Sequence, residues 1–392
     1  MLGLNNKMKG GDVVMNTQIL KDEIIAYSKT IGIDKIGFTT ASPFEELKNR
    51  LFRQQELNYQ SGFEEPDIEK RTDPSLLLQT SQSIISIALA YPTKMKNRVV
   101  SNKEERRGIF SRASWGTDYH HVVRDRLRKL ESFISEKVPN AQCKSMVDTG
   151  ELVDRAVAER AGIGWSGKNC SIITPEFGSY VYLGEMITTI PFEPDSPLED
   201  QCGDCTKCID ACPTGALIQG GQLNAQRCIA FLTQTKGFIE DEFRDKVGNR
   251  LYGCDTCQTA CPKNKSKDFH IHLEMEPDPE VVKPLLRPIL TIGNREFKDK
   301  FGSLSGSWRG KKPIQRNAII ALAFFKDVTA IPELVHVINK DPRTVLRGTA
   351  AWALGKIGGQ IAYDALNNAK SYEQDEVVLR EIDKGLRLIE KM

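Results

Sequence analysis

The strongest constraint on this chain is a short run of cysteines that ends in proline. The run contains four cysteines, Cys202, Cys205, Cys208 and Cys212, and Pro213 follows the last of them. The spacing C-x-x-C-x-x-C-x-x-x-C-P is that of a ferredoxin loop, which places three thiolates on one 4Fe-4S cluster and turns the fourth toward a second cluster. The motif therefore predicts a second set of ligands, and the sequence contains one: Cys228, Cys254, Cys257 and Cys261.

Two-cluster ferredoxins exchange their fourth ligands, so the same crossing is expected here. The first 4Fe-4S cluster is then bound by Cys202, Cys205, Cys208 and Cys261. The second is bound by Cys212, Cys228, Cys254 and Cys257. Zinc is the alternative, because paired C-x-x-C units also form tetrahedral zinc sites. Zinc requires neither three closely spaced cysteines nor the following proline.

The bulk composition narrows the class of protein. The chain has 392 residues, ten cysteines and a formal net charge of +2, so its overall charge does not indicate a nucleic-acid binder. No apolar run is long enough to span a membrane and no signal-peptide pattern opens the chain. We expect a cytoplasmic protein whose cysteines are ligands rather than disulfides, since the cytosol keeps thiols reduced.

Composition shifts divide the chain into segments. Residues 1–14 are expected to be a tail, and residues 15–194 alternate helical and strand patterns, as in an α/β domain. Strands are expected near 35–40, 83–91 and 178–190, and a basic amphipathic helix at 120–138. A proline-rich stretch precedes a two-cluster domain at 195–270. Residues 271–310 form a connecting segment.

The last segment, residues 311–392, contains an internal repeat. Similar stretches begin at Arg316, Arg347 and Arg380, which are 31 and 33 residues apart. A period of this size is typical of stacked helical repeats. We therefore predict HEAT-like helices, with an unrelated small bundle as the alternative.

Asp148 has two interpretations from its surroundings. With Glu151 three residues later, it matches a helix-capping pattern in which the aspartate oxygen accepts a first-turn N–H. It could instead be a catalytic acid, which requires a raised pKa such as burial against an apolar cofactor provides. The polar stretch from Asp118 to His121 and the loop around Arg71 are most simply structural. Nicotinamide, ATP and esterase motifs are not present.

Three stretches in this order carry a resemblance to a known family: "KRTDP" (70–74), "SRASWGTDYH" (111–120) and "VDTGELVDRAVAERAGIGWSGKN" (147–169). Together with the cysteine pattern and the repeats, they resemble the epoxyqueuosine reductases across nearly the whole chain after residue 15. The resemblance implies an α+β multidomain fold: a cobalamin domain similar to that of reductive dehalogenases, a ferredoxin-like domain with two 4Fe-4S clusters, and C-terminal HEAT-like helices.

The resemblance also implies an activity. An enzyme of this family reduces epoxyqueuosine to queuosine at the wobble position of tRNA, the last step of queuosine biosynthesis, with cobalamin that receives electrons through the two clusters. Asp148 corresponds to the family's proton donor. The cofactor contacts implied for cobalamin are Arg71, Ser111, Asp148, Ile172, Leu183, Cys254 and Asp255.

A tRNA substrate requires a basic surface, and the C-terminal segment has a modest excess of basic over acidic residues. Residues 301–392 contain 14 Lys and Arg against 10 Asp and Glu. Clustered cations suit a phosphate backbone, although a solvated basic face is the alternative for each residue. The candidate tRNA contacts are Lys236, Arg295, Lys298, Arg309, Lys311, Lys312, Arg316, Arg343 and Arg347.

Two other functions remain open from the sequence. One is a corrinoid iron-sulfur reductase that acts on a small halogenated or epoxide substrate. The other is an electron-carrying or tRNA-binding module without its own corrinoid. For the main interpretation, the expected partners are tRNA carrying epoxyqueuosine and an unidentified low-potential electron donor. We expect a monomer.

Overall fold

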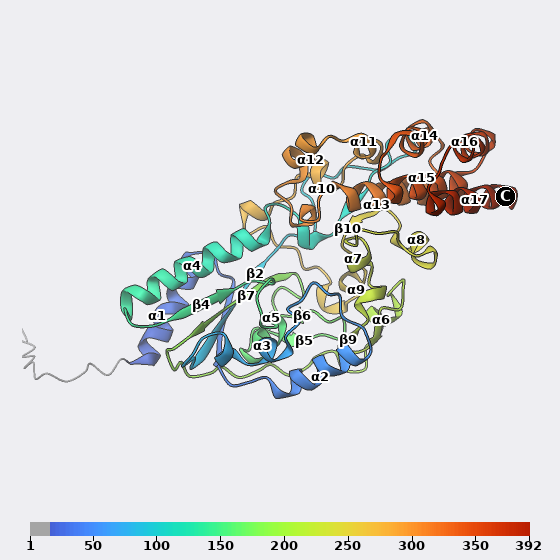
Figure 1. Cartoon of the computed structure of the whole chain (residues 1–392). Coiled ribbons are helices and arrows are strands. Elements are labelled where there is room, and N and C mark those ends of the chain that lie inside the picture. Colours follow the sequence, from blue (N-terminus) through green and yellow to red (C-terminus); the bar gives the residue numbers. More distant parts are fainter. Residues whose placement is uncertain (1–15) are drawn as a thin grey trace, which may run out of the picture.

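The computed structural model describes residues 16–392, so the predicted tail lies outside the described residues. Figure 1 shows an elongated arrangement, with a sheet-containing part at one end, the cysteine-bearing loops in the middle and stacked helices at the other end. No helix within residues 16–392 is long and apolar enough to cross a membrane.

The first part is built on a four-stranded sheet in the order β1-β2-β7-β4, with all pairs antiparallel. Its strands are β1 (Lys35–Thr40), β2 (Ser83–Ala90), β4 (Cys143–Met146) and β7 (Val181–Thr188). The predicted strands are therefore confirmed. Strands and helices alternate as expected, but the antiparallel pairing makes this part α+β.

Helices cover both faces of this sheet because alternate residues of β2 and β7 pack into separate apolar clusters. Ile85, Ile87 and Leu89 pack on the side of α1 (Thr17–Thr30) and α4 (Tyr119–Lys137). Ile84 and Ala88 face the side of α5 (Asp154–Arg160). The remaining elements of this part are α2 (Glu45–Glu56), α3 (Ile68–Thr72), η1 (Pro74–Leu76), β3 (Ile109–Phe110), η2 (Arg112–Ser114), β5 (Trp165–Ser166) and β6 (Ile172–Ile173).

The cysteine-bearing part consists of short elements joined by loops. They are α6 (Lys207–Asp210), β8 (Leu217–Gln219), β9 (Gln222–Leu223), η3 (Ala225–Arg227), α7 (Ile229–Leu232), α8 (Asp241–Val247), β10 (Arg250–Tyr252), α9 (Thr256–Thr259) and η4 (Pro262–Asn264). β10 pairs in parallel with β3, which joins this part to the first one. The backbone around Ser111 is thereby placed beside the turn that follows Tyr252.

The C-terminal part is entirely helical, as predicted. Its helices are α13 (Lys311–Phe324), α14 (Ile331–Lys340), α15 (Thr344–Ile357), α16 (Gln360–Lys370) and α17 (Glu376–Glu390). The segment before them also carries helices: α10 (Pro279–Val282), α11 (Leu286–Thr291) and α12 (Asn294–Phe301). Leu286, Phe297 and Phe301 belong to the same apolar core as the repeats, so this segment packs as part of the helical layer.

The inner helices of the repeats approach closely at two glycines. A Cβ added to Gly355 in α15 would lie 2.3 Å from the Cα of Gly385 in α17. No side chain fits in that space, so the small residues allow the two backbones to pack directly.

We predict that Gly355→Val lowers the free energy of unfolding by about 2 kcal/mol or more, because overpacking must push α15 and α17 apart. Thermal unfolding of protein with matched iron content measures the effect. Gly237→Ala is the control, since a Cβ there meets no heavy atom within 4 Å. Equal unfolding temperatures for Gly355→Val and the parent chain would contradict this packing.

Candidate active site

The first group of predicted ligands surrounds a single cavity. Its volume is about 40 Å³, and Lys168, Ile173 and Pro262 are among the other residues that line it. The cysteines around it are Cys202, Cys205, Cys208 and Cys261. Cys261 comes from the second motif, and it reaches the first because α9 packs against α6. The four residues are those of the predicted crossed set.

The remaining four cysteines form a second group around Cys257. Burial, followed by the negative charges of Cys254, Cys228 and Cys212, raises the pKa of the Cys257 thiol. Burial also raises the pKa of Cys228 to about 11, with contributions from Cys254 and Cys212. The Cys228 side chain thus lies among the same thiols despite its distance in sequence.

Asp148 does not cap a helix, so that interpretation was wrong. α5 begins at Asp154, after Val153, and no side chain caps it. Asp148 instead adopts a left-handed backbone conformation with φ of 50°, and its N–H donates to Oδ2 of Asp154 at 2.8 Å. The turn between residues 148 and 153 separates the aspartate from the helix.

The Asp148 carboxylate contacts two side chains from the start of α4. The Tyr119 hydroxyl donates to its Oδ2 at 2.8 Å, and Nε2 of His120 lies 3.3 Å from the same atom. On the other side of the imidazole, Nδ1 lies 2.7 Å from Oδ1 of Asp118. Asp118 also caps α4 by accepting the N–H of His120 at 3.0 Å. Asp118, His120 and Asp148 therefore form an acid–base chain, with a hydrogen bond at Asp118 and an ion-pair contact at Asp148.

The contacts among these side chains determine the protonation states of Asp148 and His120. The His120 imidazole, then the Tyr119 hydroxyl, lower the pKa of Asp148 despite an opposing effect of burial. Burial opposes the charge on His120, but Asp118 and Asp148 outweigh it and raise its pKa to about 9. At neutral pH, Asp148 is thus a carboxylate paired with an imidazolium. The proton of this pair resides on His120.

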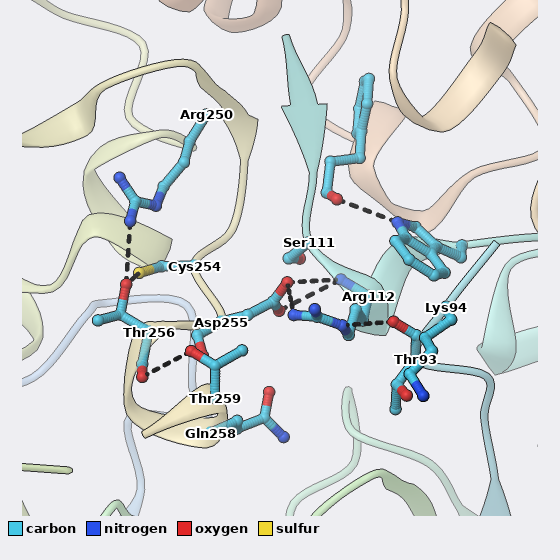
Figure 2. Close-up of polar contacts among 12 residues, drawn as sticks. Thr93, Lys94, Ser111, Arg112, Arg250, Cys254, Asp255, Thr256, Gln258 and Thr259 are labelled. Atoms are coloured by element: carbon cyan, nitrogen blue, oxygen red, sulfur yellow. Dashed lines mark hydrogen bonds and ion pairs between the residues drawn. The ribbon is translucent and has the colours of Figure 1, made fainter. Parts of the chain in front are cut away.

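Ser111, Cys254 and Asp255 are brought together by one ion pair (Figure 2). The Asp255 carboxylate accepts from the Arg112 guanidinium at 3.0 Å and from the Arg112 backbone N–H at 3.2 Å. Ser111 donates its N–H to the carbonyl of Tyr252 at 2.9 Å. Both ends of the Asp255 pair are largely buried, so burial raises the pKa of Asp255 while Arg112 opposes the shift.

The other predicted cofactor contacts lie on the α5 side of the sheet. Ile172 of β6 is buried, and Leu183 of β7 packs against the same apolar cluster. Arg71 lies in the last turn of α3 and is half-buried, and burial lowers the pKa of its guanidinium. These three predicted contacts are thus two apolar side chains and one guanidinium.

A stack of tyrosines connects the second cysteine group with Asp148. The Tyr119 and Tyr182 rings are parallel with centroids 4.5 Å apart, and Tyr182 lies 4.5 Å from Tyr91. Gln258, the residue after Cys257, donates to the Tyr91 hydroxyl at 3.2 Å. The acid–base chain and the second cysteine group are thus parts of one region.

Eight of the nine basic candidates for tRNA binding have three different environments: exposed, partly exposed, or paired with a carboxylate. Lys236, Arg295 and Lys298 are exposed, and Arg309, Lys311 and Lys312 are partly exposed. Arg343 pairs with Asp341 at 2.6 Å, and Arg347 with Glu373 at 2.7 Å, so both charges are already neutralised.

Arg316 is a correction, because it cannot serve as a tRNA contact in this structure. It is 1% exposed, and its guanidinium donates to the carbonyls of Leu232, Thr235 and Gly237. It anchors the first repeat helix to the cysteine-bearing part.

Sequence reasoning missed a group of exposed aromatic residues beside these cations. The Phe63 and Trp308 rings meet edge to face at 5.4 Å, and the Arg309 guanidinium lies over both, 5.1 Å and 4.8 Å from their centroids. It also treated His120 as structural. The Asp-x-His spacing at a helix start was the available signal for its role.

We predict that Cys261→Ser and Cys208→Ser give matching electron paramagnetic resonance spectra after reduction, because both remove ligands of the first cluster. Cys212→Ser should give a different spectrum, with the other cluster lost, and each variant should lose about half of the iron. Uncrossed ligation predicts instead that Cys208→Ser matches Cys212→Ser.

Three family models match successive parts of the chain. Residues 71–149 match "Epoxyqueuosine reductase QueG, DUF1730", residues 201–264 match a 4Fe-4S double cluster binding domain, and residues 310–387 match HEAT repeats. The middle match identifies the cysteine pattern as one for two 4Fe-4S clusters rather than zinc. The last match confirms the predicted repeats.

Relatives match over nearly their whole length. An epoxyqueuosine reductase of Bacillus anthracis is 72% identical over 96% of this chain and 99% of its own. A crystal structure of an epoxyqueuosine reductase with an epoxyqueuosine-modified tRNA-Tyr stem loop is 66% identical, with a TM-score of 0.94 over 96% of this chain and 100% of its own. A Bacillus subtilis structure, with the same identity and TM-score over 95% of this chain and 100% of its own, has its catalytic aspartate loop swung out of the active site. This chain belongs to the epoxyqueuosine reductase family.

Proposed function

We propose that this chain reduces the epoxide of epoxyqueuosine at the wobble position of tRNA and so completes queuosine synthesis. The observation that carries this proposal is the 66% identical relative bound to an epoxyqueuosine-modified tRNA stem loop, which superimposes with a TM-score of 0.94. Conversion of the epoxide to an alkene consumes two electrons and two protons and releases water. The site must therefore supply both electrons and protons.

Two 4Fe-4S clusters and cobalamin are the proposed cofactors. The cysteine groups suit two adjacent clusters, and Asn169 beside the first cavity has a buried side-chain NH₂ with no partner within residues 16–392, so it is available to a cluster sulfur. The cobalamin contacts fit in their chemistry: Ile172 and Leu183 suit an apolar corrin face, while Ser111 and Arg71 suit its polar edge. When bound, cobalamin supplies a reducible cobalt centre for breaking the C–O bond.

Asp148 and His120 are the proposed proton source for the substrate oxygen. Opening the epoxide develops alkoxide charge, and a positioned acid stabilises that charge by transferring a proton. Since Asp148 is ionised beside the His120 imidazolium, the proton that reaches the substrate comes from the pair. Asp148 delivers it, and His120 replaces it while Asp118 holds the imidazole in orientation.

The proposed tRNA surface consists of the cations that remain accessible. Arg295 and Lys298 share α12. Arg309 follows the exposed Trp308, and both donate to Gln234, two residues before Lys236. The modified base must leave its stack to bring its epoxide to the Asp148 carboxylate, whose side chain is exposed, as enzymes that act on bases require. We also propose that the chain works as a cytoplasmic monomer with an external low-potential electron donor.

The direct test is anaerobic turnover of tRNA that carries epoxyqueuosine, with cobalamin and a low-potential reductant. Nucleoside mass should show loss of one oxygen. A small aliphatic epoxide, supplied in parallel, separates this proposal from a corrinoid reductase of small substrates. Reduction of the small epoxide without change in the tRNA would support that alternative.

We predict that Asp148→Asn lowers the single-turnover rate about 10²–10⁴-fold without loss of cobalamin binding, since the proton donor is removed. The parent rate should fall as pH rises through about 9, because His120 then loses its proton. In His120→Gln, the rate should be lower and this alkaline decline should disappear. His121→Gln is the matched control and should keep the decline. An unchanged decline in His120→Gln would contradict the assignment.

We predict that Arg295→Gln weakens tRNA binding and reduces the slope of log affinity against log salt by about 1 if one phosphate contact is lost. Arg380→Gln is the matched control: each arginine lies 3.8 Å from a carboxylate one turn away and is exposed. Fluorescence anisotropy at several salt concentrations measures both. Equal slopes for the two variants would exclude Arg295 from the phosphate contacts.

A further inference from the structure

A buried carboxyl group lies on the sheet below the Asp148 turn. Glu185 occupies the middle of β7, is 0% exposed, and faces Asp154 at the start of α5. Its cross-strand neighbours are Ser86 of β2 and Met146 of β4. Neither Glu185 oxygen has a hydrogen-bond donor within residues 16–392. An ionised carboxylate in this position would be costly, so Glu185 must be neutral.

A neutral Glu185 has a proton to donate, and Asp154 is the acceptor beside it. Burial and the neighbouring Asp154 raise the pKa of Glu185 well above its usual range. Burial, followed by the charge of Asp148, raises the pKa of Asp154 to about 6. The charged groups that act on this pair are thus carboxylates, and Asp154 is the first of the two to ionise.

The ionised Asp154 contacts the candidate active site through the backbone N–H of Asp148. Its Oδ2 accepts the N–H of Asp148 at 2.8 Å, at the residue where φ is 50°. A non-glycine residue in this conformation is strained and persists only where its surroundings hold it. The hydrogen bond to Asp154 is such a restraint. The resulting conformation directs the Asp148 carboxylate toward Tyr119 and His120.

We propose that Asp154 and Glu185 share one proton and act as a positioning pair, in which Glu185 orients Asp154 and Asp154 holds the Asp148 backbone in its working conformation. This inference rests on the proposed function for its effect on rate. The restraint of the Asp148 turn by Asp154 does not depend on which reaction the enzyme catalyses. Neither residue touches the substrate in this account, and both act through Asp148.

The pair explains why carboxyl groups occupy an otherwise apolar layer. On the same face of the sheet, Ile187 packs into one apolar cluster and Leu183 against another, with Glu185 between them in the strand. An apolar residue at position 185 would join the two clusters and bury more apolar surface. A buried acid at position 185 forgoes this stabilisation. Its role in holding the Asp148 turn through Asp154 would explain why an acid occupies this position.

The first test uses amide hydrogen exchange on the cofactor-loaded chain without substrate. In Asp154→Ala, a peptide covering residues 147–153 should exchange faster than in the parent chain, because the Asp148 N–H has lost its acceptor. Peptides from β2 should be unchanged. Asp154→Asn keeps an acceptor oxygen and should restore part of the protection. Parent-like exchange in Asp154→Ala would overturn the proposal.

The second test uses rate. Asp154→Ala should lower kcat about 10²-fold, the size of effect expected from misplacing a catalytic group, with KM for tRNA unchanged. Glu185→Gln keeps a neutral donor toward Asp154 and should retain most of kcat, whereas Glu185→Leu removes the donor and should lose it. A Glu185→Gln protein as impaired as Glu185→Leu would show that a donor toward Asp154 is not what Glu185 supplies, and would overturn the positioning pair.

The two tests separate this inference from the proposed function. If the parent chain does not convert epoxyqueuosine, the exchange experiment still decides whether Asp154 holds the Asp148 turn. If conversion occurs and exchange is unaffected by Asp154→Ala, the positioning pair fails while the proposed function stands.

Discussion

The buried ion pair between Arg112 and Asp255 is the interaction on which the site depends. Asp255 follows Cys254 and precedes Cys257, so it is part of the turn that carries the second cysteine group. Arg112 lies six residues before Asp118, which caps α4 and contacts His120. The pair therefore connects the cysteine-bearing turn with the acid–base chain. Because the Arg112 and Asp255 side chains are only 26% and 16% exposed, removing one partner leaves the other charge poorly compensated.

The predicted cluster ligands and the proposed proton donor thus lie on two segments that are distant in sequence and adjacent in space. The parallel pairing of β3 with β10 aligns the backbones, and the ion pair fixes their side chains. The tyrosine stack continues from Tyr91 to Tyr119 on the same side of the site. Cluster binding and the placement of Asp148 are consequently linked through the fold.

The sequence was sufficient to predict the parts of the site that are formed by residues close together in the chain. The cysteine spacing predicted two neighbouring ligand sets, because ferredoxin loops have a characteristic separation of thiolates. The family resemblance pointed to Asp148. Its surroundings were not predictable from the local pattern, since Glu151 suggested a capping box while the chain makes a further turn before α5.

Arg316 shows the opposite difficulty. Its place in a basic stretch suggested a surface charge, but the carbonyls that accept from it belong to Leu232, Thr235 and Gly237, which lie 84, 81 and 79 positions earlier. A long side chain can be buried where several carbonyls converge, and only the tertiary arrangement brings them together. The cations around Trp308 and on α12 remain accessible, and they are the ones we propose for tRNA binding.

The central chemical claim is that the proton for the substrate resides on His120 beside an ionised Asp148. Nitrogen NMR of the chain labelled at its five histidines, with His120→Gln to assign the signal, measures this directly. The account predicts an imidazolium at pH 7.5 that titrates at about 9. A neutral His120 imidazole at pH 7.5 would contradict it.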